Sequence, residues 1–330
     1  MILMRIGIYG FGSIGRLVAR EAVKRGWEIV GAIDIDEKII GKDIGEILGF
    51  EEKYGVVVSR DVEELIDADV VVHATSSYLD KVYDQILSLV RLGIDTVSTC
   101  ETLSYPYYRY PVLARKLNEE ALRYGVTVLG TGINPGFLLD TLPIVLTAPF
   151  NIVEKIVAKR SLDASKRRKS FVEKIGIGMD PEEYMKALRE GKLTGHVGYA
   201  ESVYLIADAA GIHLDKVEER QEPIIADKDM IIGEFKVRKG EVIGIKGYGT
   251  GYKNRKEIIR LEFHAYLGAK EYEEIMVIGT DYEVRWRSTG TPGDQGTVAV
   301  VLNIANIIND LSPGLLLMTD IIPFKPFFKH

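Results

Sequence analysis

Hydrophobic and polar residues alternate with two different periods along the first 136 residues. Segments with helical spacing include Leu79 to Leu92, which stops at Gly93, and Pro111 to Tyr124, which is closed by Gly125. Short apolar runs typical of buried strands stand between such segments, at residues 4–9, 28–33, 69–74, 95–99 and 126–130. Because strands and helices take turns, this part of the sequence predicts an α/β fold with a doubly wound parallel sheet.

The pattern changes after about residue 150. Helical spacing occurs at Pro181 to Arg189 and at Ala200 to Ala210, and a series of short alternating strands follows. In residues 259–265 the apolar side chains face one way and the polar ones the other, which indicates a sheet with one wet face. We therefore predict a second α+β domain with a mixed or antiparallel sheet. Helical spacing returns at Val298 to Asp310, and we expect this helix to fold back on the first domain.

A glycine-rich motif follows the first predicted strand. It reads Gly10-Phe11-Gly12-Ser13-Ile14-Gly15. Gly10 permits a tight turn, Gly12 lets the backbone approach a pyrophosphate, and Gly15 lets the next helix pack closely on the strand. The N-terminus of that helix offers N–H groups to an anion. The motif and its neighbours predict a dinucleotide site formed by all six residues, and an unrelated glycine turn is the alternative.

The second predicted strand ends in Asp34, about 20 residues beyond the last glycine, where a ribose-binding acid is expected. A carboxylate at this position accepts hydrogen bonds from ribose hydroxyls and repels a 2′-phosphate. Asp34 therefore favours NAD as the cofactor, while Lys38 keeps NADP open.

The length of 330 residues exceeds that of a usual single core and predicts two domains. We place a dinucleotide-binding domain at residues 1–140, completed by a C-terminal segment at about 296–330, and a substrate and oligomerisation domain at 141–295. The apolar C-terminal helix and the exposed sheet favour a homodimer.

Composition excludes several classes of protein. The net charge of −6 argues against a nucleic-acid partner, and the chain has no apolar run long enough to span a membrane. Cys100 is the only cysteine, so a disulfide framework or thiolate metal cluster is excluded, and we expect no metal and a cytoplasmic location. Three Gln and seven Asn against 90 charged side chains favour a thermophilic source.

The turns that follow the parallel strands are the candidate ligand-binding segments, because ligands bind outside the carboxyl ends of such strands. The expected cofactor contacts in these turns are Thr75, Ser76, Ser77, Thr99, Cys100 and Asn134. Glu101 directly follows a central strand, where a carboxylate is costly unless it is bonded, paired or used, so we predict that it is the general base. A structural role for Glu101 is the alternative, as simple turn formation is for Asn134. Cys100 is interpreted as a packing residue rather than a nucleophile.

The second domain offers a small-molecule substrate its own candidate residues. Arg167 and Arg168 suit a substrate carboxylate, since guanidinium groups bind one bidentately, although a solvated basic patch is the commoner meaning of such a run. His196 stands between Gly195 and Gly198 in a segment that suggests close packing near a ligand, with a structural histidine as the alternative.

These residues together carry a family resemblance. The matching segments are residues 10–15, Ala32 to Asp36, Gly41 to Glu46, Ala74 to Ser77, Thr99 to Glu101, Gly130 to Phe137 and Gly195 to Gly198. They resemble the 2,4-diaminopentanoate dehydrogenases and related native amine dehydrogenases, whose fold is similar to that of dihydrodipicolinate reductase. The resemblance runs over nearly the whole chain, but Thr102 stands where many relatives carry a second acid.

The resemblance implies NAD(P)-dependent oxidative deamination of a diamino acid, such as 2,4-diaminopentanoate, to an amino-keto acid and ammonia. It implies that Glu101 is the catalytic residue and contacts the substrate, and the arginine pair then indicates an amino acid rather than a plain amine. An NAD(P)-dependent reductase of the dihydrodipicolinate or homoserine dehydrogenase type is the alternative among enzymes. A dinucleotide-sensing binding protein is the alternative outside enzymes.

Overall fold

The computed structural model describes residues 4–233 and 235–328, and it divides into two compact units. The first unit comprises Met1–Ile133 and Asp294–Asp320, and the second comprises Asn134–Gly293 and Ile321–His330. Each unit has its own sheet and its own buried core. Across residues 4–233 and 235–328, no helix combines the length and the apolar character that a membrane span requires.

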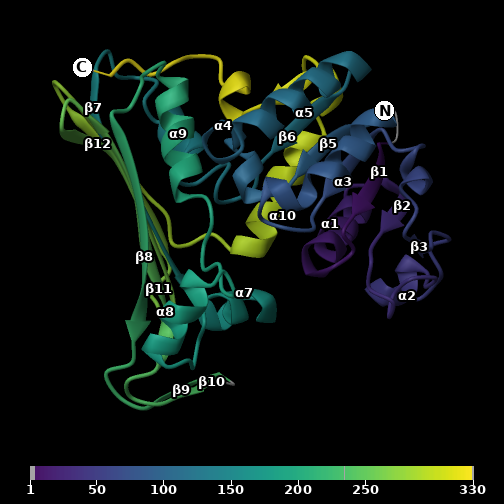
Figure 1. Cartoon of the computed structure of the whole chain (residues 1–330), viewed down its shortest axis with the longest axis horizontal. Coiled ribbons are helices and arrows are strands. Elements are labelled where there is room, and N and C mark those ends of the chain that lie inside the picture. Colours follow the sequence, from purple (N-terminus) through teal and green to yellow (C-terminus); the bar gives the residue numbers. More distant parts are fainter. Residues whose placement is uncertain (1–3, 234, 329–330) are drawn as a thin grey trace. The chain divides into compact units, whose positions relative to one another are not determined.

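The first unit contains a seven-stranded sheet in the order β15-β6-β5-β4-β1-β2-β3, and all of its strand pairs are parallel (Figure 1). The strands are β1 (Arg5–Tyr9), β2 (Glu28–Ile33), β3 (Val58–Ser59), β4 (Val70–His73), β5 (Asp95–Ser98), β6 (Thr127–Gly130) and β15 (Gly314–Leu316). The order reverses between β1 and β4, as a doubly wound sheet requires. The predicted fold class is confirmed, and the C-terminal strand β15 adds an edge that the sequence pattern did not predict.

The helices of this unit follow local rules. They are α1 (Ser13–Lys24), α2 (Ile44–Leu48), α3 (Leu79–Arg91), α4 (Pro106–Arg109), α5 (Pro111–Tyr124) and α10 (Gly293–Ala305). Helix α5 begins at a proline and ends at Gly125, whose φ of 69° is a left-handed cap. Helices α3 and α5 pack their apolar faces against the sheet, where Leu79, Ile86 and Leu117 are fully buried.

Helix α10 differs from its predicted position at both ends. The sequence pattern predicts a helix from Val298 to Asp310, whereas α10 begins at Gly293 and stops at Ala305, and Ile308–Asp310 forms a separate 3₁₀ turn. The first turn of α10 is polar, so the apolar spacing starts only where the helix becomes buried. The hydrophobic pattern marked the buried face of the helix rather than its ends.

The second unit contains a six-stranded sheet in the order β14-β13-β7-β12-β11-β8, in which only β7 and β12 are paired in parallel. Its strands are β7 (Val153–Asp163), β8 (Lys216–Ile225), β11 (Val242–Lys253), β12 (Lys256–Tyr266), β13 (Tyr272–Gly279) and β14 (Glu283–Arg287). Its helices are α6 (Thr141–Val145), α7 (Lys169–Lys174), α8 (Pro181–Arg189) and α9 (Tyr199–Ala209), and β9 (Met230–Ile232) pairs with β10 (Phe235–Val237). The predicted mixed sheet is confirmed.

Side chains alternate between the two faces of this sheet. On β12, Ile259 and Leu261 are buried, while Glu262 on the other face forms ion pairs with Lys159 and Arg260. Helix α9 lies along the buried face (Figure 1). The glycines of β11 make room for it, since a Cβ on Gly249 would lie 2.8 Å from a carbonyl oxygen of α9. The predicted wet face is therefore confirmed.

His73 is a fully buried histidine at the end of β4. Its Nδ1 lies 2.9 Å from Ser98 Oγ, and its Nε2 lies 2.8 Å from Gln85 Oε1 and 2.9 Å from Thr75 Oγ1. Burial lowers the pKa of His73 to about 4, although the bond to Gln85 acts in the opposite direction. The folded protein therefore keeps this ring neutral at pH values where an exposed histidine takes up a proton.

We expect acid to destabilise the fold through His73. The stabilisation is complete above about pH 6.5, where the unfolded ring is also neutral, and it is lost as the pH falls toward 4. Between pH 7 and pH 5 this group should lower the free energy of unfolding by about 2 kcal/mol. Urea unfolding of wild type and His73→Gln at both pH values measures the effect. The variant should lose less stability than wild type, and the exposed-site control His213→Gln should behave as wild type; equal losses in all three would contradict the assignment.

Candidate functional site

The turns after β1 and β4 meet where the strand order of the first unit reverses. Gly10 has a φ of +98°, and a Cβ at this position would lie 2.6 Å from the carbonyl oxygen of Ala74. Only glycine fits this close approach. The glycine motif is therefore placed at the carboxyl ends of the central strands, where a ligand-binding crevice is expected.

The turn after β5 is tied to both of its neighbours. The Thr102 N–H donates to Ser77 O at 3.1 Å, and the Leu79 N–H donates to Thr102 Oγ1 at 2.8 Å. A Cβ on Gly130, at the end of β6, would lie 2.5 Å from the carbonyl carbon of Leu103. Glu101 begins the short 3₁₀ helix Glu101–Leu103 and is half-buried. Its backbone is thus fixed at the carboxyl end of a central strand.

Asp34 bonds the glycine motif directly. Its Oδ2 accepts a 2.7 Å hydrogen bond from the Phe11 N–H, and its Oδ1 accepts from the N–H groups of Ile35 and Asp36 at 2.7 and 2.9 Å. Three backbone donors therefore hold the carboxylate in one position, beside the loop that contains Gly12.

The start of α1 is open to a ligand. A Cβ on Gly12 would meet nothing within 4 Å, and no side chain caps this helix. A Cβ on Gly15, by contrast, would lie 2.0 Å from the carbonyl oxygen of Gly10. Ser13 is exposed and Ile14 is half-buried, whereas the Phe11 ring is fully buried. The loop offers space and uncapped N–H groups, which is the arrangement that binds a phosphate.

The other predicted contacts of the first unit differ in exposure. Thr75 and Ser76 are exposed, Ser77 and Thr99 are half-buried, and Cys100 is fully buried. Burial raises the pKa of the Cys100 thiol to about 12, and the charge of Glu101 adds to this effect. The thiol therefore stays protonated and packs in the core, as the sequence interpretation of a non-nucleophilic cysteine requires.

Two buried hydroxyl groups near these turns were not singled out from the sequence. Ser104 Oγ and Thr131 Oγ1 are buried, and neither has a hydrogen-bond partner among the residues that the structure describes. Buried hydroxyls are normally bonded, so such groups indicate a place for a ligand or for water.

The Asn134 turn belongs to the second unit and packs against the His196 segment. A Cβ on Gly198, whose φ is +110°, would lie 2.6 Å from Cδ of Pro135. The buried Asp140 joins this turn to α9, since it accepts hydrogen bonds from the Gly136 N–H at 2.9 Å and from Ser202 Oγ at 2.6 Å. Both polar atoms of the Asn134 amide are buried without a partner among residues 4–233 and 235–328.

His196 is packed between aromatic rings. Its ring stacks on Phe263 at 4.3 Å between centroids and meets the edge of Tyr199 at 4.9 Å. Gln221 Oε1 accepts from its backbone N–H at 3.1 Å. Burial lowers the pKa of His196 well below its usual value, and the charges of Lys174, Arg160 and Arg167 lower it further. The ring is therefore neutral, and the charges that act on it are positive.

Two of these cations come from the segment around α7. Arg167 lies 4.8 Å from the centroid of the Phe171 ring, and Lys174 Nζ lies 6.0 Å from the same centroid. The carbonyl of Lys174 accepts from the Gly195 N–H at 3.0 Å, which ties α7 to the His196 segment. The structure thus brings Arg167 and His196 together. Arg168 precedes α7 and donates from Nε to Ser170 Oγ at 3.1 Å.

Sequence reasoning missed Arg160, Lys174 and Tyr199, which lie around His196, and Tyr184, which acts on Tyr199. The Tyr184 and Tyr199 hydroxyls are buried without a hydrogen-bond partner in the described part of the chain. Burial raises the pKa of Tyr184 to about 12 and that of Tyr199 well above 10, so both remain donors. Only Arg160 could have been found from the sequence. It is a charged residue at a position of β7 whose alternation predicts a buried side chain.

Two family descriptions match this chain. Residues 137–326 match the 2,4-diaminopentanoate dehydrogenase C-terminal domain, and residues 4–99 match the N-terminus of dihydrodipicolinate reductase. The chain is 32% identical to a 2,4-diaminopentanoate dehydrogenase from Acetoanaerobium sticklandii, over 97% of this chain and 92% of that protein.

Solved structures share the fold. An amine dehydrogenase from Mycobacterium smegmatis superposes with a TM-score of 0.86 at 22% identity, covering 96% of this chain and 95% of that one. GenD2 from gentamicin A biosynthesis, solved in complex with NAD, has a TM-score of 0.59 at 14% identity, covering 97% of this chain and 90% of that one.

The two neighbouring glycines of the α1 loop should respond differently to a methyl group. Gly12→Ala should leave the free energy of unfolding within about 0.5 kcal/mol of wild type, because its Cβ points into open space. It should weaken NADH binding by about tenfold or more, because that space is where a phosphate approaches the backbone. Gly15→Ala should instead destabilise the fold by about 1–3 kcal/mol. Urea unfolding and NADH titration by fluorescence separate the two effects, and unchanged NADH affinity in Gly12→Ala would refute the phosphate site.

Proposed function

Since the chain belongs to the 2,4-diaminopentanoate dehydrogenase family, we propose that this amine dehydrogenase acts on a diamino acid such as 2,4-diaminopentanoate. The reaction is an oxidative deamination: the carbon that carries the amine becomes a keto carbon, and ammonia leaves. The observation that carries this choice of substrate is the cationic surrounding of the His196 segment. Arg167 and Lys174 contribute to it from either end of α7, which is bonded to that segment through the Lys174 carbonyl, whereas the charge of Arg160 is compensated by Glu273. Such a surrounding suits an acid rather than a plain amine.

The first unit supplies the residues that fit a nicotinamide dinucleotide. The space at Gly12 and the uncapped start of α1 suit the pyrophosphate. When bound, the nicotinamide accepts a hydride from the carbon that carries the amine. We propose NAD rather than NADP, because the Asp34 carboxylate is held in place by three N–H groups and repels a 2′-phosphate.

Glu101 is the proposed catalytic base. Its carboxylate follows a central strand, and the neighbouring turns fix its backbone. Loss of a hydride from the substrate leaves a cationic iminium carbon, which a nearby carboxylate stabilises in a poorly hydrated site. The same carboxylate can accept a proton from the attacking water and return it to the nitrogen that leaves as ammonia.

The second unit supplies the proposed recognition of the substrate carboxylate. Arg167 is the anchor, because its guanidinium packs on the buried Phe171 ring, 4.8 Å from the centroid, and its charge acts on His196. Arg168 instead donates to the exposed Ser170. His196, being neutral, contributes hydrogen bonding rather than charge. The Tyr199 and Tyr184 hydroxyls are further donors on the same side of the sheet, and the Asn134 amide is a further polar group of this unit.

The predicted homodimer and thermophilic source stay predictions. They rest on the apolar C-terminal helix, the exposed face of the sheet and the amide-poor composition.

Replacing Glu101 by Gln should preserve NADH binding and reduce kcat by ~10²–10⁴-fold, because the amide keeps the shape of the side chain but cannot accept a proton. Steady-state oxidation of 2,4-diaminopentanoate, followed by NADH absorbance, measures the loss. In the reverse direction, NADH oxidation should require ammonia. Activity of the variant close to wild type would remove Glu101 from this role, and reduction without ammonia would favour the reductase alternative.

Replacing Arg167 by Ala should raise KM for the diamino acid by about 10- to 100-fold, as expected for loss of a charge-assisted hydrogen-bonded pair. The kcat/KM for an amine that lacks a carboxylate should change little. Arg168→Ala is the matched control and should leave both values near wild type. Assays with both substrates and with NAD⁺ and NADP⁺ give the comparison, and a larger effect of Arg168→Ala would shift the anchor to that residue.

A further inference from the structure

We infer that Gly293 and the buried Arg160–Glu273 ion pair are positioning residues that hold the Arg167 guanidinium in place for the substrate carboxylate. The inference rests on the proposed function, since it assumes that Arg167 recognises that carboxylate. It adds a determinant of substrate choice within the segment that joins β14 to α10.

Gly293 provides the space that the guanidinium occupies. A Cβ built on Gly293 would lie 1.3 Å from Nη1 of Arg167, 2.3 Å from Cζ and 2.8 Å from Nη2. Nearly the whole guanidinium therefore lies against the main chain of Gly293, in the place of a missing side chain. Phe171 provides a second contact, with its ring centroid 4.8 Å from Cζ. Both contacts restrict where the charged end of Arg167 can lie.

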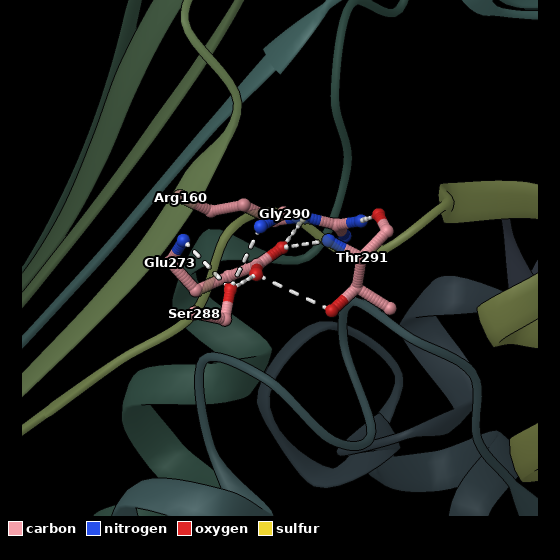
Figure 2. Close-up of polar contacts among 5 residues, drawn as sticks. All are labelled: Arg160, Glu273, Ser288, Gly290 and Thr291. Atoms are coloured by element: carbon pink, nitrogen blue, oxygen red, sulfur yellow. Dashed lines mark hydrogen bonds and ion pairs between the residues drawn. The ribbon is translucent and has the colours of Figure 1, made fainter.

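The chain just before Gly293 is fixed by a buried ion pair. Glu273 Oε1 accepts a 3.1 Å hydrogen bond from the Thr291 N–H, and Glu273 Oε2 accepts from Thr291 Oγ1 at 3.2 Å. Arg160 Nη2 donates to the carbonyl of Thr291 at 3.0 Å. Figure 2 shows both partners converging on this residue. The donor and the acceptor of the Thr291 backbone are therefore both bonded, two residues before Gly293.

Ser288 secures the other end of the same turn. Its hydroxyl donates to Glu273 and accepts from the Gly290 N–H at 3.0 Å, and it also accepts from the Glu273 N–H at 3.2 Å (Figure 2). The segment from β14 to α10 is thus bonded at three residues, Ser288, Gly290 and Thr291, and these bonds fix its path toward Gly293.

The ion pair itself is buried to an unusual degree. The side chains of Arg160 and Glu273 are each 2% exposed, and Arg160 Nε lies 3.2 Å from Glu273 Oε1. Burial of two charges costs several kcal/mol in desolvation, and the attraction between them compensates only when further hydrogen bonds complete the pair. The bonds described above, one from Arg160 and three to the carboxylate of Glu273, go to the segment 288–291. The pair therefore serves to fix that segment rather than merely to stabilise the sheet.

The decisive variant is Gly293→Ala. Its methyl group would overlap the end of a flexible side chain, so the guanidinium is displaced while the backbone keeps its path. We expect KM for the diamino acid to rise by about 10- to 100-fold, as in Arg167→Ala, with kcat/KM for a plain amine unchanged. Thr289→Ala, at an exposed position of the same segment, is the control and should match wild type.

A double-mutant cycle shows whether Gly293 acts through Arg167. In the Arg167→Ala background, the Gly293→Ala change should add less than about twofold to KM, because the displaced group is already absent. Additive effects would overturn the inference.

Thr291→Val keeps the backbone bonds but removes the hydroxyl donor to Glu273. This variant should raise KM for the diamino acid alone; an equal fall in kcat/KM for both substrates would also contradict the inference.

The outcomes separate the two proposals. If Arg167→Ala raises KM while soluble, folded Gly293→Ala and Thr291→Val match wild type, the positioning role is refuted and the proposed substrate stands. If Arg167→Ala itself leaves KM unchanged, the carboxylate anchor fails, and the positioning role fails with it. Thermal unfolding and NADH titration of every variant identify a general loss of folding.

Discussion

The ion pair between Arg160 and Glu273 is the constraint on which the second unit depends. The two residues are direct neighbours on β7 and β13, and Phe263 on β12 lies on the other side of Arg160 at the same level. The His196 ring stacks on Phe263. Glu273 accepts a hydrogen bond from the Thr291 N–H, in the segment that leads to Gly293. One row across the sheet therefore positions both the neutral histidine and the guanidinium that we assign to the substrate. A strand interior is well suited to this task because its geometry is rigid.

The first unit reaches a similar result with glycines in place of charges. Gly10 and Gly130 let main-chain segments from different turns touch, so that the turns after β1, β4, β5 and β6 are linked by close contacts and backbone hydrogen bonds. Glu101 lies in the turn after β5, and Asp34 is hydrogen-bonded to Phe11 in the turn after β1. The two units thus show two ways to fix functional side chains, one by a buried ion pair and one by close backbone packing.

Much of the fold could be predicted from the sequence because local rules decide it. The strand and helix periods set the parallel sheet, Gly125 ends α5, and the alternation in residues 259–265 sets the wet face. The comparisons confirm the family that the glycine motif, the Glu101 turn and the His196 segment resemble. These signals are short and lie within single turns or single strands, so one chain without relatives is enough to find them.

The remaining features depend on contacts between distant segments. Gly293 follows Pro292 in what looks like an ordinary loop, and only the fold brings Arg167 against it from more than 120 positions away. The hydroxyl of Tyr184 is enclosed by residues from other segments and has no hydrogen-bond partner among residues 4–233 and 235–328. Likewise, three residues of β15 join the sheet at its edge, and so short a run has no period of its own.

The protonated, fully buried thiol of Cys100 has a practical consequence. Cys100 directly precedes Glu101 in the chain, yet its sulfur is shielded from solvent and unreactive in the folded state. Alkylating reagents should therefore modify the protein only when the end of β5 opens transiently. The rate at which Cys100 is labelled therefore measures how often the structure next to Glu101 opens locally. No cysteine has to be introduced for this measurement.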